Sequence, residues 1–218
     1  MKLKHRCVIF DLDGTLVDTL GDIAASMNRS LKLHLFPELR TEEYKEKVGW
    51  GIRRLAYLSL PESARKDETV AAVAADAARF YAENPLGHSR PYPGIPALLG
   101  ALRQMKVKAA VITNKPDPAA QLIIGGLFPQ DTFCHVQGEI TGRPRKPDPA
   151  CVWDLMVELN LNPADVIIAG DSEVDIETAL ASGCYPLGVA WGYRSREIII
   201  DAGARRVIEK PEELLDLF

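Results

Sequence analysis

The run CVIFDLDGTLVDT, residues 7–19, joins a short apolar stretch directly to a group of polar residues. Its first four residues, Cys7 to Phe10, form a short apolar run with β-branched residues, which predicts a buried strand. Asp11, Asp13 and Gly14 follow at once. The carboxyl ends of parallel strands form the edge at which ligands bind. Because Gly14 lets the chain turn there, both carboxylates can face one crevice, where two like charges need a cation or a proton between them.

Four more apolar runs rich in β-branched residues predict further strands, at residues 109–112, 134–136, 166–169 and 186–190. Between them, apolar residues recur at the helical period, most clearly in 95–105 and 152–159. Strands that alternate with helices pair in parallel through right-handed crossovers. The sequence therefore predicts an α/β fold with a Rossmann-like parallel-sheet core and helices on both of its faces.

The segment from about residue 20 to residue 84 interrupts this alternation, because it contains helical patterns and no convincing strand. In 67–83, for example, apolar residues fall on one side of a helix. The stretch 90–94, RPYPG, follows as a hinge or boundary. We predict an inserted all-helical cap domain over residues 17–87 and a catalytic core made of residues 1–16 and 88–218.

Length and composition exclude several classes of protein. The 218 residues suffice for one catalytic domain with an insertion, and 47% hydrophobic with 26% charged residues fits neither a disordered nor a fibrous chain. A formal net charge of −4 argues against nucleic acid as a partner. No apolar stretch approaches the ~18–20 residues of a membrane span, and the four cysteines lack disulfide or zinc spacing. We expect a cytoplasmic protein that binds small solutes, of undefined oligomeric state.

Three further polar groups follow predicted strands or lie in a loop between them. Thr113 and Asn114 end the second strand and are suited to bind phosphate oxygens. Lys146 lies before a predicted helix and could neutralise an anion. Asp171 and Asp175 follow the most hydrophobic strand, and several carboxylates at one strand end favour a hard cation such as Mg²⁺.

Each group taken alone also has an ordinary structural interpretation. Aspartates are common in turns and helix caps, Thr113 and Asn114 can simply end a strand and cap a helix, and lysines are mostly solvated surface charges. The combination decides, because the groups occur in order and the carboxylates, Thr113 and Asn114 stand at the carboxyl ends of predicted parallel strands.

With these motifs the chain resembles the haloacid dehalogenase superfamily of phosphotransferases, whose hallmark begins as residues 11–19 do here. The resemblance spans nearly the whole chain. It implies that Asp11 is a nucleophile that forms an aspartyl-phosphate and that Asp13 is the general acid and base. It further implies that Thr113 and Lys146 bind phosphate. Mg²⁺ would be held by Asp11, Asp171 and the backbone carbonyl of Asp13, with Asp175 supporting these groups.

The helical insertion directly after the first motif resembles the phosphoglycolate phosphatase and beta-phosphoglucomutase branch of that superfamily. Residues 48–55, VGWGIRRL, resemble the Gly-x-Gly cap loop of the phosphoglycolate phosphatases, although Trp50 is a bulky departure. The resemblance implies a small phosphorylated metabolite such as 2-phosphoglycolate as substrate. Asn114, Gly51 and Arg53 are the candidate substrate-binding residues, with Arg53 or the neighbouring Arg54 reaching the carboxylate.

Three other functions stay open at this point. A phosphatase of other specificity would act on a sugar phosphate, a nucleotide or pyrophosphate. A phosphomutase would share the core machinery but retain the phosphoenzyme. A phospho-accepting signalling receiver would also combine an aspartate, a hydroxyl and a lysine at strand ends, but it needs neither Asp13 nor a helical insertion.

Overall fold

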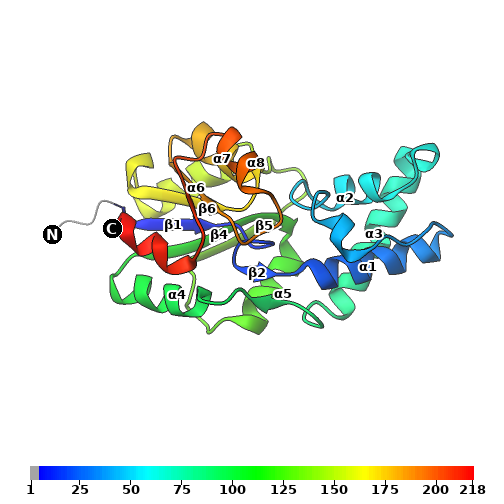
Figure 1. The fold of residues 1–218 in the computed structure, drawn as a ribbon, viewed down its shortest axis with the longest axis horizontal. Helices are drawn as coiled ribbons and strands as arrows, with labels where there is room; N and C mark the ends of the chain where they lie inside the picture. Colours follow the sequence, from blue (N-terminus) through cyan, green and yellow to red (C-terminus); the bar gives the residue numbers. More distant parts are fainter. Residues whose placement is uncertain (1–4) are drawn as a thin grey trace.

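A six-stranded parallel sheet forms the centre of the computed structural model, which describes residues 5–218 (Figure 1). Residues 1–4 of the predicted core segment lie outside the described residues. In chain order the strands are β1 (Cys7–Phe10), β4 (Lys108–Pro116), β5 (His135–Glu139), β6 (Val166–Gly170), β7 (Tyr185–Val189) and β8 (Arg206–Ile208). In space their order is β5-β4-β1-β6-β7-β8, and every neighbouring pair is parallel. The predicted Rossmann-like sheet is confirmed.

The strand β8 at the edge of the sheet was not predicted. Only three residues long, it pairs with β7 through Leu187, Gly188 and Val189, and two of its residues are half-buried. A run this short carries no periodicity that separates a strand from a loop. The other five strands overlap the apolar runs from which they were predicted, although β5 shares only residues 135 and 136 with its run.

Helices cover both faces of the sheet, as predicted (Figure 1). On one face lie α4 (Ile95–Gln104) and α5 (Asp117–Leu127), and on the other lie α6 (Ala150–Leu159), α7 (Glu173–Ser182) and α8 (Arg196–Asp201). Because side chains alternate along a strand, β1 supplies both layers. Val8 and Phe10 belong to the larger apolar core, whereas Cys7 and Ile9 pack in a second cluster that includes residues of α6. This two-sided burial explains the uninterrupted apolar run.

Three helices fill the segment in which we predicted a helical insertion: α1 (Leu20–Leu33), α2 (Ile52–Ser59) and α3 (Asp67–Glu83). No strand occurs within residues 20–89, all of which the structure describes. The three helices lie together beyond the carboxyl ends of the sheet strands (Figure 1). The division into a core and a cap at residues 17–87 stays a prediction, and we call residues 20–83 the helical segment. Short 3-10 turns complete the chain at Thr41–Tyr44, Glu62–Ala64, Pro163–Asp165 and Pro211–Leu217.

The two ends of the helical segment are tied together by a small antiparallel ribbon. Its strands are β2 (Val17–Asp18) and β3 (Arg90–Pro91). Next to the ribbon, the buried carboxylate of Asp22 in α1 accepts hydrogen bonds from the Ser89 backbone N–H at 2.8 Å and the Ser89 hydroxyl at 2.6 Å. The chain therefore leaves the sheet region and returns to it at adjacent points.

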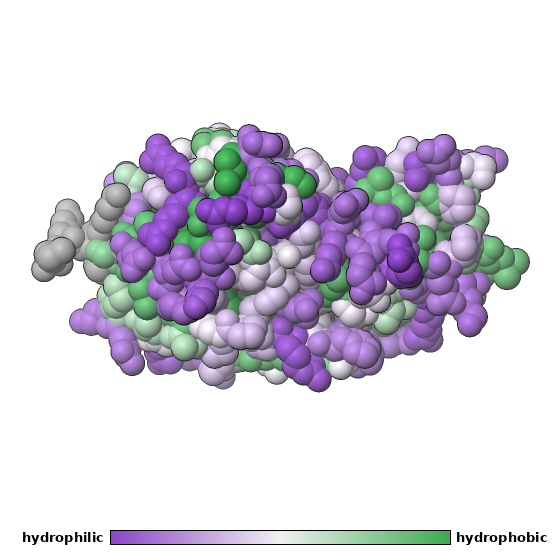
Figure 2. Space-filling view, in the orientation of Figure 1, coloured by the Kyte–Doolittle hydropathy of each residue, from purple (hydrophilic) through white to green (hydrophobic). Residues whose placement is uncertain are grey.

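The face of the molecule shown in Figure 2 is mostly hydrophilic, and its outline narrows between the sheet and the helical segment. Among the described residues, no helix has the length and apolar character that crossing a bilayer requires. The cytoplasmic location stays a prediction.

Candidate active site

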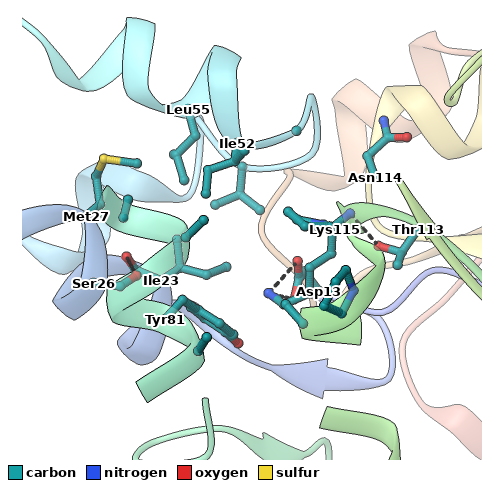
Figure 3. Close-up of a pocket in the computed structure, with 18 of the residues that line it drawn as sticks. Asp13, Ile23, Ser26, Met27, Ile52, Leu55, Tyr81, Thr113, Asn114 and Lys115 are labelled. Carbon is teal, nitrogen blue, oxygen red and sulfur yellow. Dashed lines mark hydrogen bonds and ion pairs between the residues drawn. The ribbon is translucent and has the colours of Figure 1, made fainter. Parts of the chain in front are cut away.

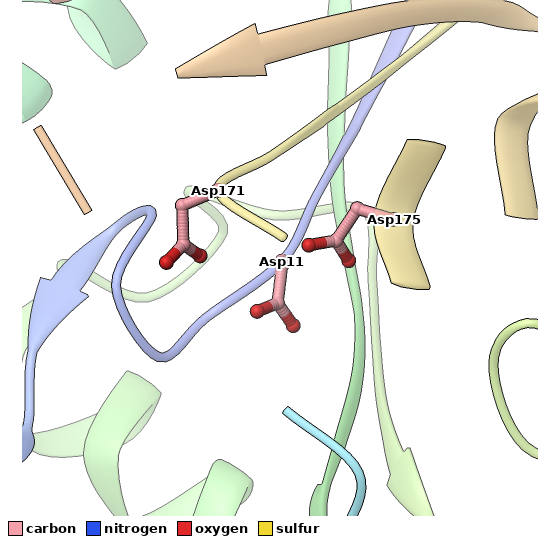
Figure 4. A group of neighbouring side chains, drawn as sticks. All are labelled: Asp11, Asp171 and Asp175. Atoms are coloured by element: carbon pink, nitrogen blue, oxygen red, sulfur yellow. The ribbon is translucent and has the colours of Figure 1, made fainter. Parts of the chain in front are cut away.

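Three carboxylates gather at the carboxyl edge of the sheet (Figure 4). Asp11 follows β1, Asp171 follows β6, and Asp175 lies in the first turn of α7. Each offers one oxygen, and these three oxygens lie within 4.8 Å of one another. All three residues are buried. Hard cations such as Mg²⁺ prefer carboxylate oxygens, so the donor set fits the metal that the sequence predicts. Asp13 contributes no side chain to this group; the prediction that its backbone carbonyl binds the metal stays untested.

Neighbouring residues hold two of these carboxylates in place. Asp171 accepts hydrogen bonds from the Thr15 hydroxyl at 3.0 Å and the Tyr193 backbone N–H at 2.7 Å. Asp175 accepts the Ser172 hydroxyl at 2.7 Å. The chain turns out of β1 at Gly14, whose φ of +85° favours glycine, and a Cβ there would lie 2.4 Å from an Asp171 oxygen. Gly14 is thus required both for the turn and for the approach of Asp171.

Lys146 lies between two of the carboxylates. Its Nζ is 2.8 Å from Asp11 Oδ1 and 2.6 Å from Asp175 Oδ1, and the three side chains are buried. Burial acts to lower the pKa of Lys146, but the two negative charges outweigh it and raise the pKa above its ordinary value. A permanently charged ammonium therefore stands beside Asp11, where the predicted phosphate would bind.

Burial raises the pKa of both Asp11 and Asp171. The pKa of Asp11 rises to about 6, with the charge of Lys146 opposing the effect of burial. The pKa of Asp171 rises to about 8, because the charges of Asp175 and Asp11 add to the effect of burial. The folded protein thus holds protons on these groups at pH values where the unfolded chain has released them.

From these two pKa values we predict that the metal-free protein loses stability as pH rises from about 4 to about 8. A raised carboxyl pKa contributes stability below the unfolded value, near 3.8, and this contribution disappears as pH passes the folded values. Mg²⁺ binds the ionised carboxylates of the native state, so it should raise the melting temperature more at pH 8 than at pH 5. Thermal melts with EDTA or with saturating Mg²⁺ at both pH values test this. An equal or absent Mg²⁺ effect at the two pH values would contradict it.

Asp13 faces a different partner from Asp11. Its carboxylate oxygens lie 3.0 and 3.1 Å from Nζ of Lys115, and the Thr19 hydroxyl donates to Oδ1 at 2.6 Å. The Lys115 ammonium also lies 4.2 Å from the centre of the Tyr81 ring. The ion pair with Lys115 and the Thr19 hydroxyl therefore fix the position of the Asp13 carboxylate at the cavity. Sequence reasoning gave Lys115 no role; the structure shows that β4, expected over residues 109–112, continues through Lys115 to Pro116.

A cavity of about 190 Å³ lies between the sheet edge and the helical segment (Figure 3). Asp11, Asp13, Thr113, Asn114 and Lys115 line its sheet side. The Thr113 hydroxyl accepts the Lys115 backbone N–H at 3.3 Å and so keeps its own hydrogen available for a ligand. Mainly apolar side chains from α1, α2, α3 and α5 form the rest of the wall, among them Ile23, Met27, Ile52, Leu55, Ala77 and Leu122. Of the four predicted catalytic residues, Asp11, Asp13 and Thr113 line the cavity, and Lys146 contacts the Asp11 carboxylate at 2.8 Å.

The loop before α2 reaches over to the sheet side of this cavity. Gly51 lines the cavity with a φ of +81°, and a Cβ there would lie 2.8 Å from Arg145 Nη1. The Asn114 amide donates to the carbonyls of Gly49 and Lys146, both at 2.9 Å. Its buried Oδ1 has no hydrogen-bond partner in the part of the chain that the structure describes. Asn114 therefore uses its nitrogen to bind the protein, and its predicted contact with substrate stays a prediction.

The structure does not bring Arg53 and Arg54 to the cavity. Arg53 forms an exposed ion pair with Asp67 at 3.3 Å, and the Arg54 guanidinium lies 5.0 Å from the centre of the Tyr57 ring. Neither lines the cavity. The helix explains this, because Ile52 and Leu55, three residues apart, take the cavity face and turn the two arginines away from it. The predicted contact with a substrate carboxylate stays a prediction.

Comparison with known proteins agrees with this fold. The haloacid dehalogenase-like hydrolase family matches residues 8–189. The chain is 36% identical to the phosphoglycolate phosphatase of Rhodospirillum rubrum, over 94% of this chain and 87% of that one. It is 33% identical to the phosphoglycolate phosphatase of Chromobacterium violaceum, over 100% and 98% of the two chains. A crystal structure described as a predicted phosphoglycolate phosphatase from Haemophilus somnus superposes with a TM-score of 0.91 at 27% identity, covering 98% of each chain.

A parallel sheet with three buried carboxylates at its carboxyl edge defines an α/β protein with a candidate ligand site at that edge. The chain belongs to the haloacid dehalogenase-like hydrolase family. Within that family, relatives and structural neighbours that match nearly its whole length identify it as a phosphatase.

Proposed function

We propose that this protein is a Mg²⁺-dependent phosphomonoester hydrolase that works through an aspartyl-phosphate on Asp11. One observation carries the proposal. The Asp11 carboxylate lines the cavity, lies 2.8 Å from the Lys146 ammonium, and shares a 4.8 Å cluster with Asp171 and Asp175. Phosphoryl transfer needs this combination of a positioned nucleophile and charge neutralisation. The exposed ion pairs elsewhere in the molecule offer neither.

The residues divide the reaction into two steps. Asp11 attacks phosphorus, the bond from phosphorus to the ester oxygen breaks, and the leaving alkoxide takes a proton from Asp13. Water then attacks the aspartyl-phosphate and gives a proton to Asp13, which releases inorganic phosphate and restores both groups. Lys146 and Thr113 bind phosphate oxygens. Mg²⁺ held by Asp11 and Asp171 would neutralise part of the phosphate charge.

Lys115 positions Asp13 for this scheme, because its ammonium binds both carboxylate oxygens of Asp13 at the cavity. In the second step Asp13 takes a proton from water. The proton gained there is the one that Asp13 donates to the leaving oxygen in the next turnover. Asp13 therefore alternates between the two forms without any further proton donor.

The proposed substrate is a small phosphorylated metabolite such as 2-phosphoglycolate. Two observations support this choice. The relatives that match the whole chain carry that name, and the Gly-x-Gly loop lines a cavity of about 190 Å³, which restricts the size of the leaving group. Arg53 and Arg54 point elsewhere, so the carboxylate would have to be bound by other groups.

Phosphate release from a panel of esters tests the proposal. We expect Mg²⁺-dependent turnover, suppressed by EDTA, with 2-phosphoglycolate giving a higher kcat/KM than aryl phosphate, pyrophosphate, a nucleoside monophosphate or hexose phosphates. If another ester in the panel gives a higher kcat/KM, the proposed mechanism stands and that ester's class replaces 2-phosphoglycolate as the proposed substrate. If phosphate stayed on the protein without release, the phosphomutase and receiver interpretations would take its place.

A further inference from the structure

One buried arginine of the sheet region binds the loop before α2, residues 45–51, part of which lines the cavity. Arg194, which follows β7, is 7% exposed, and its guanidinium donates to the carbonyls of two residues of this loop, Lys45 and Val48. The hydrogen bond to the Val48 carbonyl is 2.7 Å long. A single side chain thus binds two backbone groups that lie almost 150 positions earlier in the sequence.

The third contact of Arg194 links it to the same loop through Glu173. Its Nε donates to Glu173 Oε2 at 3.1 Å, and Glu173 Oε1 accepts the indole N–H of Trp50 at 3.1 Å. Glu173 is the first residue of α7, so it is fixed to the sheet region. Two side chains, Arg194 and Glu173, therefore hold three residues of the loop, Lys45, Val48 and Trp50. A guanidinium with its planar fork of donors is suited to such a task, and a lysine is not.

Loop 45–51 forms part of the candidate active site. Val48, Gly49 and Gly51 line the cavity that Asp11 and Thr113 also line. Gly49 accepts the Asn114 amide, which ties the same loop to the end of β4. Release of the loop would open this side of the cavity to water without changing Asp11, Asp171 or Lys146. The contacts of Arg194 thus favour the closed arrangement over an open one.

We propose that Arg194, acting with Glu173 and Trp50, is a positioning residue that holds loop 45–51 closed over the cavity. The proposal rests on the proposed phosphatase function for its effect on activity, whereas the closure itself can be measured without any substrate. Arg194 touches neither the three carboxylates nor Lys146 among its hydrogen bonds in the described chain. Its effect on the reaction therefore passes through the loop.

Two variants test the proposal. Arg194→Met removes the guanidinium and keeps an unbranched side chain, and Trp50→Phe removes only the indole N–H at a half-buried position. Arg196→Met is the matched control, because Arg196 lies two residues away and forms an exposed ion pair with Glu209. The probe of closure is trypsin under native conditions, read by mass spectrometry as cleavage after Lys45, whose carbonyl Arg194 binds.

We expect Trp50→Phe, which loses one hydrogen bond to a charged group, to accelerate cleavage after Lys45 about tenfold. Arg194→Met loses three hydrogen bonds donated by a charged group, and cleavage should accelerate on the order of a hundredfold. Arg196→Met should match the wild type. In the steady state, KM should rise by a larger factor than kcat falls, because saturating substrate restores closure while the competent fraction of free enzyme has decreased.

Unchanged cleavage in both variants would overturn the proposal, and so would a fall in kcat with KM unchanged. If Arg194→Met does not fold, the rate of trypsin cleavage after Lys45 in Trp50→Phe still tests the proposal. If the wild-type protein hydrolyses no ester in the panel, the proposed function fails, and trypsin cleavage alone then confirms or refutes the closure.

Discussion

Replacing Asp11 with asparagine is expected to lower kcat by about 10⁴-fold or more, because the amide cannot attack phosphorus as the carboxylate does. The variant should still fold. Asparagine has nearly the same volume, and although the ion pair with Lys146 is lost, Lys146 keeps Asp175 as a buried partner and the repulsion of Asp11 by Asp175 and Asp13 disappears. Phosphate release under saturating Mg²⁺ and thermal melts of the same preparations are the two measurements.

Asp201→Asn is the control for this experiment, since the same chemical change falls on an exposed residue at the end of α8. It should leave kcat within a factor of two. Brief incubation of the wild-type protein with labelled ester and acid quenching should in addition trap label on the peptide that contains Asp11. Residual activity of the Asp11→Asn protein above about one per cent would show that another group is the nucleophile.

Replacing Lys146 with methionine is expected to give the largest loss of stability among substitutions at the site. Lys146 is the cation between the buried carboxylates of Asp11 and Asp175, and removing one member of a buried ion pair costs about 3–5 kcal/mol. Urea unfolding of the metal-free protein at pH 7 measures this free energy. The loss should shrink at pH 5, where protonation of Asp11 removes one of the two uncompensated charges.

Lys32→Met controls for the loss of a lysine, because its side chain is 78% exposed and only 3.9 Å from the exposed Glu38. Exposed pairs contribute about 0–1 kcal/mol, so this variant should unfold nearly as the wild type does. If Lys146→Met unfolds at the same urea concentration as Lys32→Met, the buried ion pairs do not stabilise the fold as we describe.

The sequence was informative where function and fold use the same local pattern. An apolar run followed by Asp11, Asp13 and Gly14 is a strand with its turn, and the same residues build the site, so one signal located both. Asp171 and Asp175 were found in the same way, after β6. These predictions needed only the alternation of strands and helices and the position of polar groups after each strand.

Residues that act across long sequence separations escaped prediction. Arg194 contacts residues almost 150 positions away, and Tyr193 contributes only a backbone N–H to Asp171, which any residue could supply. The substrate contact of Arg53 stays a prediction. Its closeness in sequence to the glycine loop suggested that contact, and in the structure the rotation of about 100° per residue along α2 places Arg53 beside the exposed Asp67.

The ribbon between β2 and β3 has a consequence for how this architecture can diversify. Val17 pairs with Pro91 and Asp18 pairs with Arg90, so the chain between them begins and ends at one place. Insertions succeed where their two ends lie close together. The whole intervening stretch can therefore be lengthened, shortened or exchanged for a different module in the course of evolution or in a chimeric protein. The spacing of the six parallel strands, and of the carboxylates that follow them, would not change.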